Sequence, residues 1–162
     1  MLSPTASAGT PRTGNARDPW SPQEAGLFLL RTGIGIVFLR HGVPKFLGTP
    51  EHGARETWEM LGGAMGAFGI HFAPVFWGFL SAFAEAAGGL ALVLGVLVRP
   101  FAALMLVNML VATAFHAGQH HGWAQISHPL SLAIVFLCLL LAGGGRLAAG
   151  RALPGLRGKW HQ

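Results

Sequence analysis

Four long apolar segments follow one another along the chain and are separated by short polar or glycine-rich stretches. We predict helices at residues 22–41, 74–99, 100–117 and 128–146. A helix needs about 20 apolar residues, at about 1.5 Å each, to cross the roughly 30 Å hydrocarbon core of a bilayer. Helices also satisfy their own backbone hydrogen bonds, which lipid cannot do. The pattern therefore predicts an all-α fold, an integral membrane four-helix bundle over residues 21–147.

The first of these helices has recognisable start and stop signals. Ser21 can act as the N-cap, Pro22 occupies the first helical position, and Glu24 completes a capping box. At the other end, Gly42 and Pro44 follow the apolar run. Because glycine and proline both favour the end of a helix, we expect this helix to stop at about residue 41.

Between the first two apolar segments, residues 51–70 carry apolar side chains at helical spacing. The apolar positions are Trp58, Leu61, Met65 and Phe68, and the polar positions are Glu51, Arg55, Glu56 and Glu59. This arrangement is typical of an amphipathic helix that lies on the membrane surface, or of a re-entrant helix that folds back over the mouth of the bundle. The alternative is a poorly ordered loop.

Composition supports a membrane protein with a single domain. Of the 162 residues, 52% are hydrophobic and 10% are charged, whereas about a quarter of the residues in a soluble domain are charged. Residues 1–20 lack an apolar core, which predicts a disordered cytoplasmic tail rather than a signal peptide. Residues 148–162 are predicted to form a basic cytoplasmic tail. The single cysteine, Cys138, excludes a disulfide within the chain.

The distribution of lysine and arginine predicts the orientation of the bundle. With both termini in the cytoplasm, that side carries Arg12, Arg17, Arg99, Arg146, Arg151, Arg157 and Lys159, and the opposite side carries Arg40, Lys45 and Arg55. This excess predicts a multi-pass protein of the cell's inner membrane with cytoplasmic N and C termini. Because the basic residues lie at segment ends and in the tails, the net charge of +5 indicates topology rather than nucleic-acid binding.

The stretch LSAFAEAAGGLALVLG, residues 80–95, contains one ionisable residue, Glu85, near the middle of the second segment. A charged side chain at the bilayer centre costs about 2.5–3.5 kcal/mol on insertion scales, so it should be paired or protonated. We predict a pair with Arg31, which falls at a similar depth on the first helix. Two roles remain open: a buried ion pair that only fixes packing, and the wall of a ligand or proton site.

Other polar residues are further candidates for a pocket. Asn108 lies in the middle of the third segment, where its amide needs a partner; its alternative role is a structural hydrogen bond between helices. The stretch RHGVPK places His41 and Lys45 where the first helix ends, and His116 lies at the end of the third. We expect no metal site, because Gly118 would interrupt the helix that a pair of histidine ligands needs here.

Two stretches resemble the DoxX/DoxD-like family of membrane proteins. LLRTGIGIVFLRHGVPKFLG, residues 29–48, is similar to that family's first helix, with its mid-helix arginine and terminal HGxxK. AEAAGGLALVLGVLVRPFAALMLVNMLVATAFHA, residues 84–117, is similar to its second and third helices. The resemblance covers about residues 27–147 and implies a four-helix membrane bundle. At residues 143–150 the chain has GGGRLAAG where the family commonly has a GPGRxSxD-like run, which argues against a role for that serine or aspartate.

The resemblance also implies function in outline. Some members are subunits of sulfur-compound:quinone oxidoreductases, and others accompany redox or detoxification enzymes. The positions that match the family pattern are Arg31, His41, Lys45, Glu85, Arg99 and His116. Our candidates for pocket or ligand residues are Arg31, Glu85, Asn108, His41, His116 and Lys45, and no catalytic residue is assigned.

The residues and the resemblance together favour a quinone-linked or redox-associated subunit of a membrane oxidoreductase system. No cofactor motif is encoded, since GIGIVFLRHG places its glycines within an apolar helix and not in a dinucleotide-binding loop. A quinone is the expected ligand, and electrons would come from a membrane or soluble redox partner protein or from a small reductant. The alternatives are a non-enzymatic adaptor that recruits or stabilises a partner protein, and a small proton-coupled transporter, which four short helices without an inverted repeat disfavour.

Overall fold

The computed structural model describes residues 21–152, which are almost entirely helical. Four helices are long and apolar enough to cross a membrane, namely α1 (Pro22–Leu47), α3 (Pro74–Leu94), α4 (Val98–Gly118) and α5 (Trp123–Ala142). The remaining elements are a shorter helix, α2 (Ala54–Gly62), the 3-10 turn η1 (Gly63–Phe68) and a last turn, η2 (Ala149–Ala152). The structure confirms the predicted bundle with an extra helix after the first span. The first predicted tail and most of the second lie outside the described residues.

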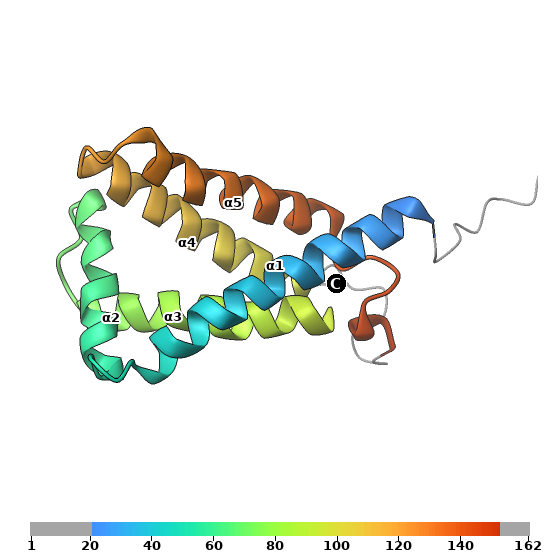
Figure 1. Cartoon of the computed structure of the whole chain (residues 1–162), viewed down its shortest axis with the longest axis horizontal. Coiled ribbons are helices and arrows are strands. Elements are labelled where there is room, and N and C mark those ends of the chain that lie inside the picture. Colours follow the sequence, from blue (N-terminus) through green and yellow to red (C-terminus); the bar gives the residue numbers. More distant parts are fainter. Residues whose placement is uncertain (1–20, 153–162) are drawn as a thin grey trace, which may run out of the picture.

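The four spanning helices run along the molecule, and α2 crosses one end of it (Figure 1). α1 packs along α3, α4 packs along α5, and α2 lies against the beginning of α3. α3 and α4 are joined by a short turn and diverge toward the end where α2 lies. They form a wedge whose wide end is crossed by α2, with η1 in contact with α4. We call this wide end the α2 end of the bundle.

The spanning helices meet in a common core. Phe38 of α1 and Phe136 of α5 pack edge to face with 5.0 Å between their ring centroids, which joins the first and last spans. Leu92 of α3 and Met105 of α4 belong to the same cluster and are fully buried. Because lipid is as apolar as these side chains, close packing and aromatic contacts rather than hydrophobic burial favour this association.

α1 and α3 approach most closely where glycines face the partner helix. A side chain at Gly35 or Gly89 would collide with backbone atoms of the facing helix, and one at Gly42 would overlap the backbone of Glu85 and Ala86. Small residues at such positions allow two membrane helices to pack backbone against backbone. The contacts fix the register of the pair, with Gly35 opposite Gly89 and Gly42 opposite Glu85.

α1 is longer than the sequence predicts. The expected end is at about residue 41, but the helix continues to Leu47 with Pro44 inside it. A proline removes a single backbone hydrogen bond, and Gly42 is held against α3 rather than ending the helix. In addition, Trp58 of α2 donates from Nε1 to the carbonyl of Lys45 at 3.0 Å. Tertiary contacts therefore extend the helix past Gly42 and Pro44, which by themselves predict its end.

The predicted limits of the later helices are also corrected. α3 ends at Leu94 rather than residue 99, because Gly95 adopts a left-handed φ of 70°, and α4 begins shortly after this turn, a little earlier than predicted. α5 ends at Ala142 rather than residue 146, where Gly143 has a φ of 75°. α5 begins at Trp123 rather than residue 128, so that Pro129 lies inside the helix. Left-handed backbone favours glycine, so these positions stop the helices within apolar sequence.

The predicted N-cap of α1 is confirmed. The Oγ atom of Ser21 accepts a hydrogen bond from the N–H of Glu24 at 3.4 Å. The side chain of Glu24 reaches the segment after α5, where its Oε2 accepts the backbone N–H of Arg146 at 2.7 Å. This contact joins the start of α1 to the segment that follows α5.

We predict that Gly42→Ala lowers the stability of the bundle and that Gly33→Ala does not. A methyl group at position 42 meets the backbone of α3, whereas at Gly33 no atom lies within 4 Å of it. Overpacking of this kind costs about 1–3 kcal/mol, while alanine is favoured over an exposed helical glycine by up to about 1 kcal/mol. Thermal unfolding in mild detergent, followed by circular dichroism, measures the difference. Equal unfolding midpoints for the two variants would contradict the α1–α3 packing.

Candidate functional site

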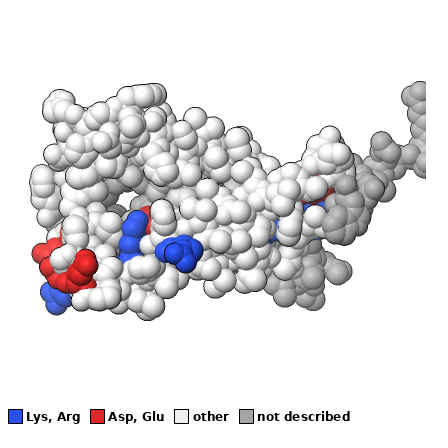
Figure 2. Space-filling model, viewed as in Figure 1, with Lys and Arg blue, Asp and Glu red and all other residues white. Residues whose placement is uncertain are grey.

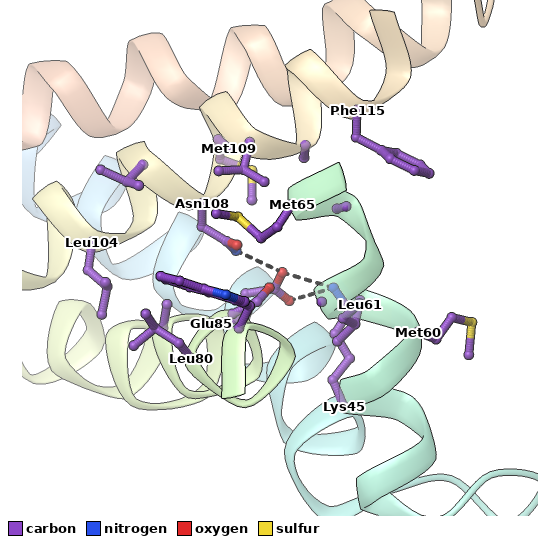
Figure 3. A pocket seen from close by; sticks show the side chains of 18 of the residues that line it. Lys45, Met60, Leu61, Met65, Leu80, Glu85, Leu104, Asn108, Met109 and Phe115 are labelled. Carbon is purple, nitrogen blue, oxygen red and sulfur yellow. Dashed lines mark hydrogen bonds and ion pairs between the residues drawn. The ribbon is translucent and has the colours of Figure 1, made fainter. Parts of the chain in front are cut away.

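A cavity of about 490 Å³ lies inside the wedge between α3 and α4, at the α2 end (Figure 3). Most of its wall is apolar, and the apolar side chains that line it include Leu61, Met65, Leu80, Leu104, Val111 and Phe115. Polar side chains reach it from three spanning helices: Lys45 from α1, Ser81 and Glu85 from α3, and Asn108 and His116 from α4. Four of the six predicted pocket residues therefore border the same cavity.

The polar wall of the cavity is organised around the carboxylate of Glu85. The Nζ atom of Lys45 lies 2.7 Å from Oε2 and 2.9 Å from Oε1 of Glu85. Asn108 donates from Nδ2 to Oε1 at 3.3 Å. Figure 3 shows these side chains converging from three helices on one point of the wall. We call Lys45, Glu85 and Asn108 the polar cluster.

The two charged members of the polar cluster differ in exposure. The side chain of Glu85 is 5% exposed and that of Lys45 is 34% exposed. A buried carboxylate needs an opposite charge and hydrogen-bond donors to compensate for lost hydration, and the cluster supplies both. The ammonium group has three N–H donors, and the carboxylate oxygens accept two of them. The third donor, together with the amide of Asn108, can interact with a polar group in the cavity.

The elements around Lys45 explain how it reaches Glu85. Gly42 fixes α1 directly opposite Glu85, and Lys45 follows in the next helical turn, which exists only because α1 continues past Pro44. The carbonyl of Lys45 is held by Trp58, whose ring packs edge to face on Phe79 of α3 at 5.1 Å. The end of α1 is thus fixed from both α2 and α3.

The predicted ion pair between Glu85 and Arg31 is wrong. Arg31 donates instead to backbone carbonyls, those of Leu92, Val93 and Leu147, the last two at 3.2 and 3.4 Å. The prediction assumed that α1 and α3 begin and end at the same depths in the membrane, which would put Arg31 level with Glu85. In the structure α1 begins well past the end of α3 (Figure 1). Arg31 therefore lies beside the last turn of α3, about 10 Å along that helix from Glu85 at 1.5 Å per residue.

Arg31 has a clear structural role in this position. It is 1% exposed, and its guanidinium donates to the carbonyls of Leu92 and Val93 in the last turn of α3, where the carbonyls of a helix lack their regular i+4 partners. A cation there also interacts favourably with the helix dipole. Arg99 acts similarly on the neighbouring helix, since its Nη2 donates to the carbonyl of Leu141 in the last turn of α5 at 3.1 Å. These arginines stabilise helix ends away from the cavity.

The two candidate histidines lie in different environments. His116 lines the cavity, and its Nδ1 lies 2.7 Å from Nδ1 of His121, an exposed residue in the loop after α4. One of these rings must donate the hydrogen bond and the other must accept it. His41 is exposed on α1 and does not line the cavity. His120 lies past the end of α4 with a φ of 53°, so it does not share a helix face with His116.

Two residues that shape the site carry little signal in the sequence. Ser81 lies one turn before Glu85, and its small size indicates only a place for close approach. Trp58 holds the carbonyl of Lys45, but a tryptophan on an amphipathic helix predicts no more than a position at the membrane interface. Only the tertiary structure brings these residues to the Lys45–Glu85 pair.

We predict energetic coupling between Lys45 and Glu85 and almost none between Arg31 and Glu85. Double-mutant cycles built from Lys45→Met, Arg31→Met and Glu85→Leu test this by unfolding in mild detergent. Residues in direct contact couple by about 0.5–3 kcal/mol, and residues more than about 10 Å apart by less than about 0.5 kcal/mol. A coupling energy for Arg31 as large as that for Lys45 would mean that the polar cluster is wrongly described.

Comparison with known proteins agrees with this architecture. A family model, DoxX, matches residues 26–118, which is more than half of the chain and includes every member of the polar cluster. No curated protein and no solved structure gives a significant match. The four apolar helices and the family match together establish a multi-pass membrane protein. The chain belongs to the DoxX family.

Proposed function

We propose that this DoxX protein is a quinone-linked, redox-associated subunit of a membrane oxidoreductase system, and that it binds the quinone in the cavity between α3 and α4. The observation that carries the proposal is the polar cluster on the wall of a cavity that is otherwise mostly apolar. Small-molecule sites typically combine apolar walls with a few convergent polar groups. A quinone has the matching chemistry, with polar carbonyl groups on a ring that carries an apolar tail.

The residues present fit such a ligand. Lys45 and Asn108 can donate hydrogen bonds to a carbonyl oxygen, and Glu85 orients both donors by accepting from them. The side chains of Leu104, Val111 and their neighbours supply apolar contacts for the ring and tail. Bound there, a quinone would supply two-electron redox chemistry coupled to protons. In this proposal the electrons are exchanged with a membrane or soluble redox partner protein.

Proton exchange with water has a candidate group in the wall of the cavity. His116 lines the cavity and shares a short hydrogen bond with His121, which is exposed. Imidazole exchanges protons readily near neutral pH. Within the proposal, this pair connects the cavity to the aqueous phase at the α2 end.

The orientation that we propose is that of an inner-membrane protein with cytoplasmic N and C termini. Its support is the excess of lysine and arginine at the end opposite α2 and in the chain termini. The acidic side chains Glu51, Glu56 and Glu59 lie at the α2 end, where Figure 2 shows glutamate atoms gathered near α2. The cavity and His116 would then lie in the outer half of the bilayer.

A second candidate function is a non-enzymatic adaptor. The observation that favours it is the exposed polar face of α2, which carries Arg55, Glu56 and Glu59. Figure 2 shows charged atoms gathered at this end of the molecule. Such a face offers charged contacts to a partner protein outside the bilayer. In this function the polar cluster would serve packing alone.

We predict that the protein purified in mild detergent retains a quinone and that Glu85→Gln loses it, with at least about a tenfold drop in occupancy. A neutral amide at position 85 has a single acceptor oxygen, so it cannot hold Lys45 and Asn108 in the same arrangement. Mass spectrometry of the organic extract, together with an absorption spectrum, measures the occupancy.

Two matched variants accompany this experiment. Glu59→Gln makes the same chemical change on the exposed face of α2, and Arg31→Gln perturbs the opposite end of the bundle; both should keep the quinone. Circular dichroism checks that each variant is folded. Equal occupancy in wild type and Glu85→Gln would contradict the proposed site. A ligand-free wild type that purifies with a bound protein would favour the adaptor.

A further inference from the structure

We infer that the ligand enters the cavity laterally, from the hydrocarbon phase of the bilayer, and that the polar cluster selects a lipid-soluble ligand with an uncharged head group. The inference deepens the proposed function and rests on it for the identity of the ligand. It concerns the route and the ligand class, which can be measured without any redox activity.

The end of the cavity that faces the membrane boundary is covered by protein. α2 lies across this end, and the backbone at Gly62 and Trp58 packs directly on α3, at Pro74 and Gly78. η1 continues the cover to α4. Leu61 and Met65 point inward from this cover in Figure 3. A ligand from the aqueous phase would have to pass this apolar layer.

The side of the bundle, in contrast, is open. Figure 2 views the molecule across its helix axes and shows a hollow beside α2 in which charged atoms are visible. Lys45 of the polar cluster keeps 34% of its side chain exposed. Val107 lines the cavity and is 57% exposed near the middle of α4. Surface at the middle of a spanning helix faces hydrocarbon, so an opening at this depth admits molecules dissolved in lipid.

The depth of the polar cluster agrees with this route. Glu85 is near the middle of α3, about 16 Å from the start of that helix at Pro74 at 1.5 Å per residue. Asn108 is likewise near the middle of α4. An amphiphile whose head group binds there must leave the bilayer surface, which strongly charged head groups do only at high energetic cost.

The charges of the cavity wall lead to the same ligand class. The positive charge of Lys45 and the negative charge of Glu85 are in direct contact and cancel. An ionic head group would have to break this pair or remain uncompensated in a poorly hydrated cavity, and both are costly. A neutral carbonyl or hydroxyl needs only the remaining donors of Lys45 and Asn108. The wall therefore favours uncharged polar heads over carboxylates, phosphates and ammonium groups.

The test uses photolabelling in nanodiscs that hold the full chain. The probe is a long-chain alkyl diazirine dissolved in the bilayer, and peptide mass spectrometry locates its photoadducts. We expect an adduct at Glu85, which faces the cavity and is otherwise buried. A water-soluble carbodiimide with a charged amine should modify the exposed Glu56 and Glu59 but not Glu85.

Filling the cavity supplies the matched control. Ala112 lines the cavity on α4, whereas Ala103 lies on the same helix outside it. Ala112→Trp should lower the Glu85 adduct by about tenfold, and Ala103→Trp should leave it nearly unchanged. A Glu85 adduct that is absent in wild type, or that both variants lower equally, would overturn the lateral route. So would carbodiimide modification of Glu85.

Competition tests the ligand class. Methyl hexadecanoate, hexadecyl phosphate and hexadecyltrimethylammonium carry apolar chains of nearly equal length and differ in head-group charge, and they are compared at equal mole fraction. Only the neutral ester should reduce the adduct, and equal competition by all three would overturn the selection for an uncharged head. A long-tailed benzoquinone is added separately. If it does not compete while the ester does, the proposed quinone function fails and the lateral route stands.

Discussion

The close approach of α1 and α3 is the constraint on which the rest of the structure depends. Gly42 has no side chain, so the backbone of α1 rests on α3 at Glu85. This contact sets the register of the two helices and leaves Lys45 within reach of the carboxylate. It also places Arg31 at the last turn of α3. A single packing interaction thus decides which basic residue neutralises the buried acid.

The buried acid in turn explains the unusual end of α1. A carboxylate in hydrocarbon requires a compensating charge, and that charge lies on the far side of Pro44, which would ordinarily end a helix. The pair with Glu85 and the hydrogen bond from Trp58 hold the additional turn in place. Lys45 is long and partly exposed, so it can adjust its position while its ammonium group remains with Glu85. A shorter or more rigid cation would lack this freedom.

The polar residues of the bundle fall into two groups with different tasks. Arg31 and Arg99 lie at the end opposite α2 and satisfy carbonyls at the ends of neighbouring helices. The polar cluster and His116 lie in the wider half, where α3 and α4 have diverged and leave a cavity. Tight packing at one end and an open wedge at the other let a small bundle combine stability with space for a ligand.

The sequence by itself determined the four spans, the additional helix after the first, and the need of Glu85 for a partner, because hydropathy and helical periodicity act locally. It also identified Lys45, Asn108 and His116 as candidate pocket residues. It could not determine the partner of Glu85, because the positions of Arg31 and Glu85 within their own helices do not determine how α1 and α3 are offset along each other. That offset depends on which glycines face each other across the two helices. The length of α1 was decided by contacts with α2 and α3, which override the local signal of Pro44. The cavity exists only because α3 and α4 diverge beneath α2, and such a void has no counterpart in the linear pattern of residues.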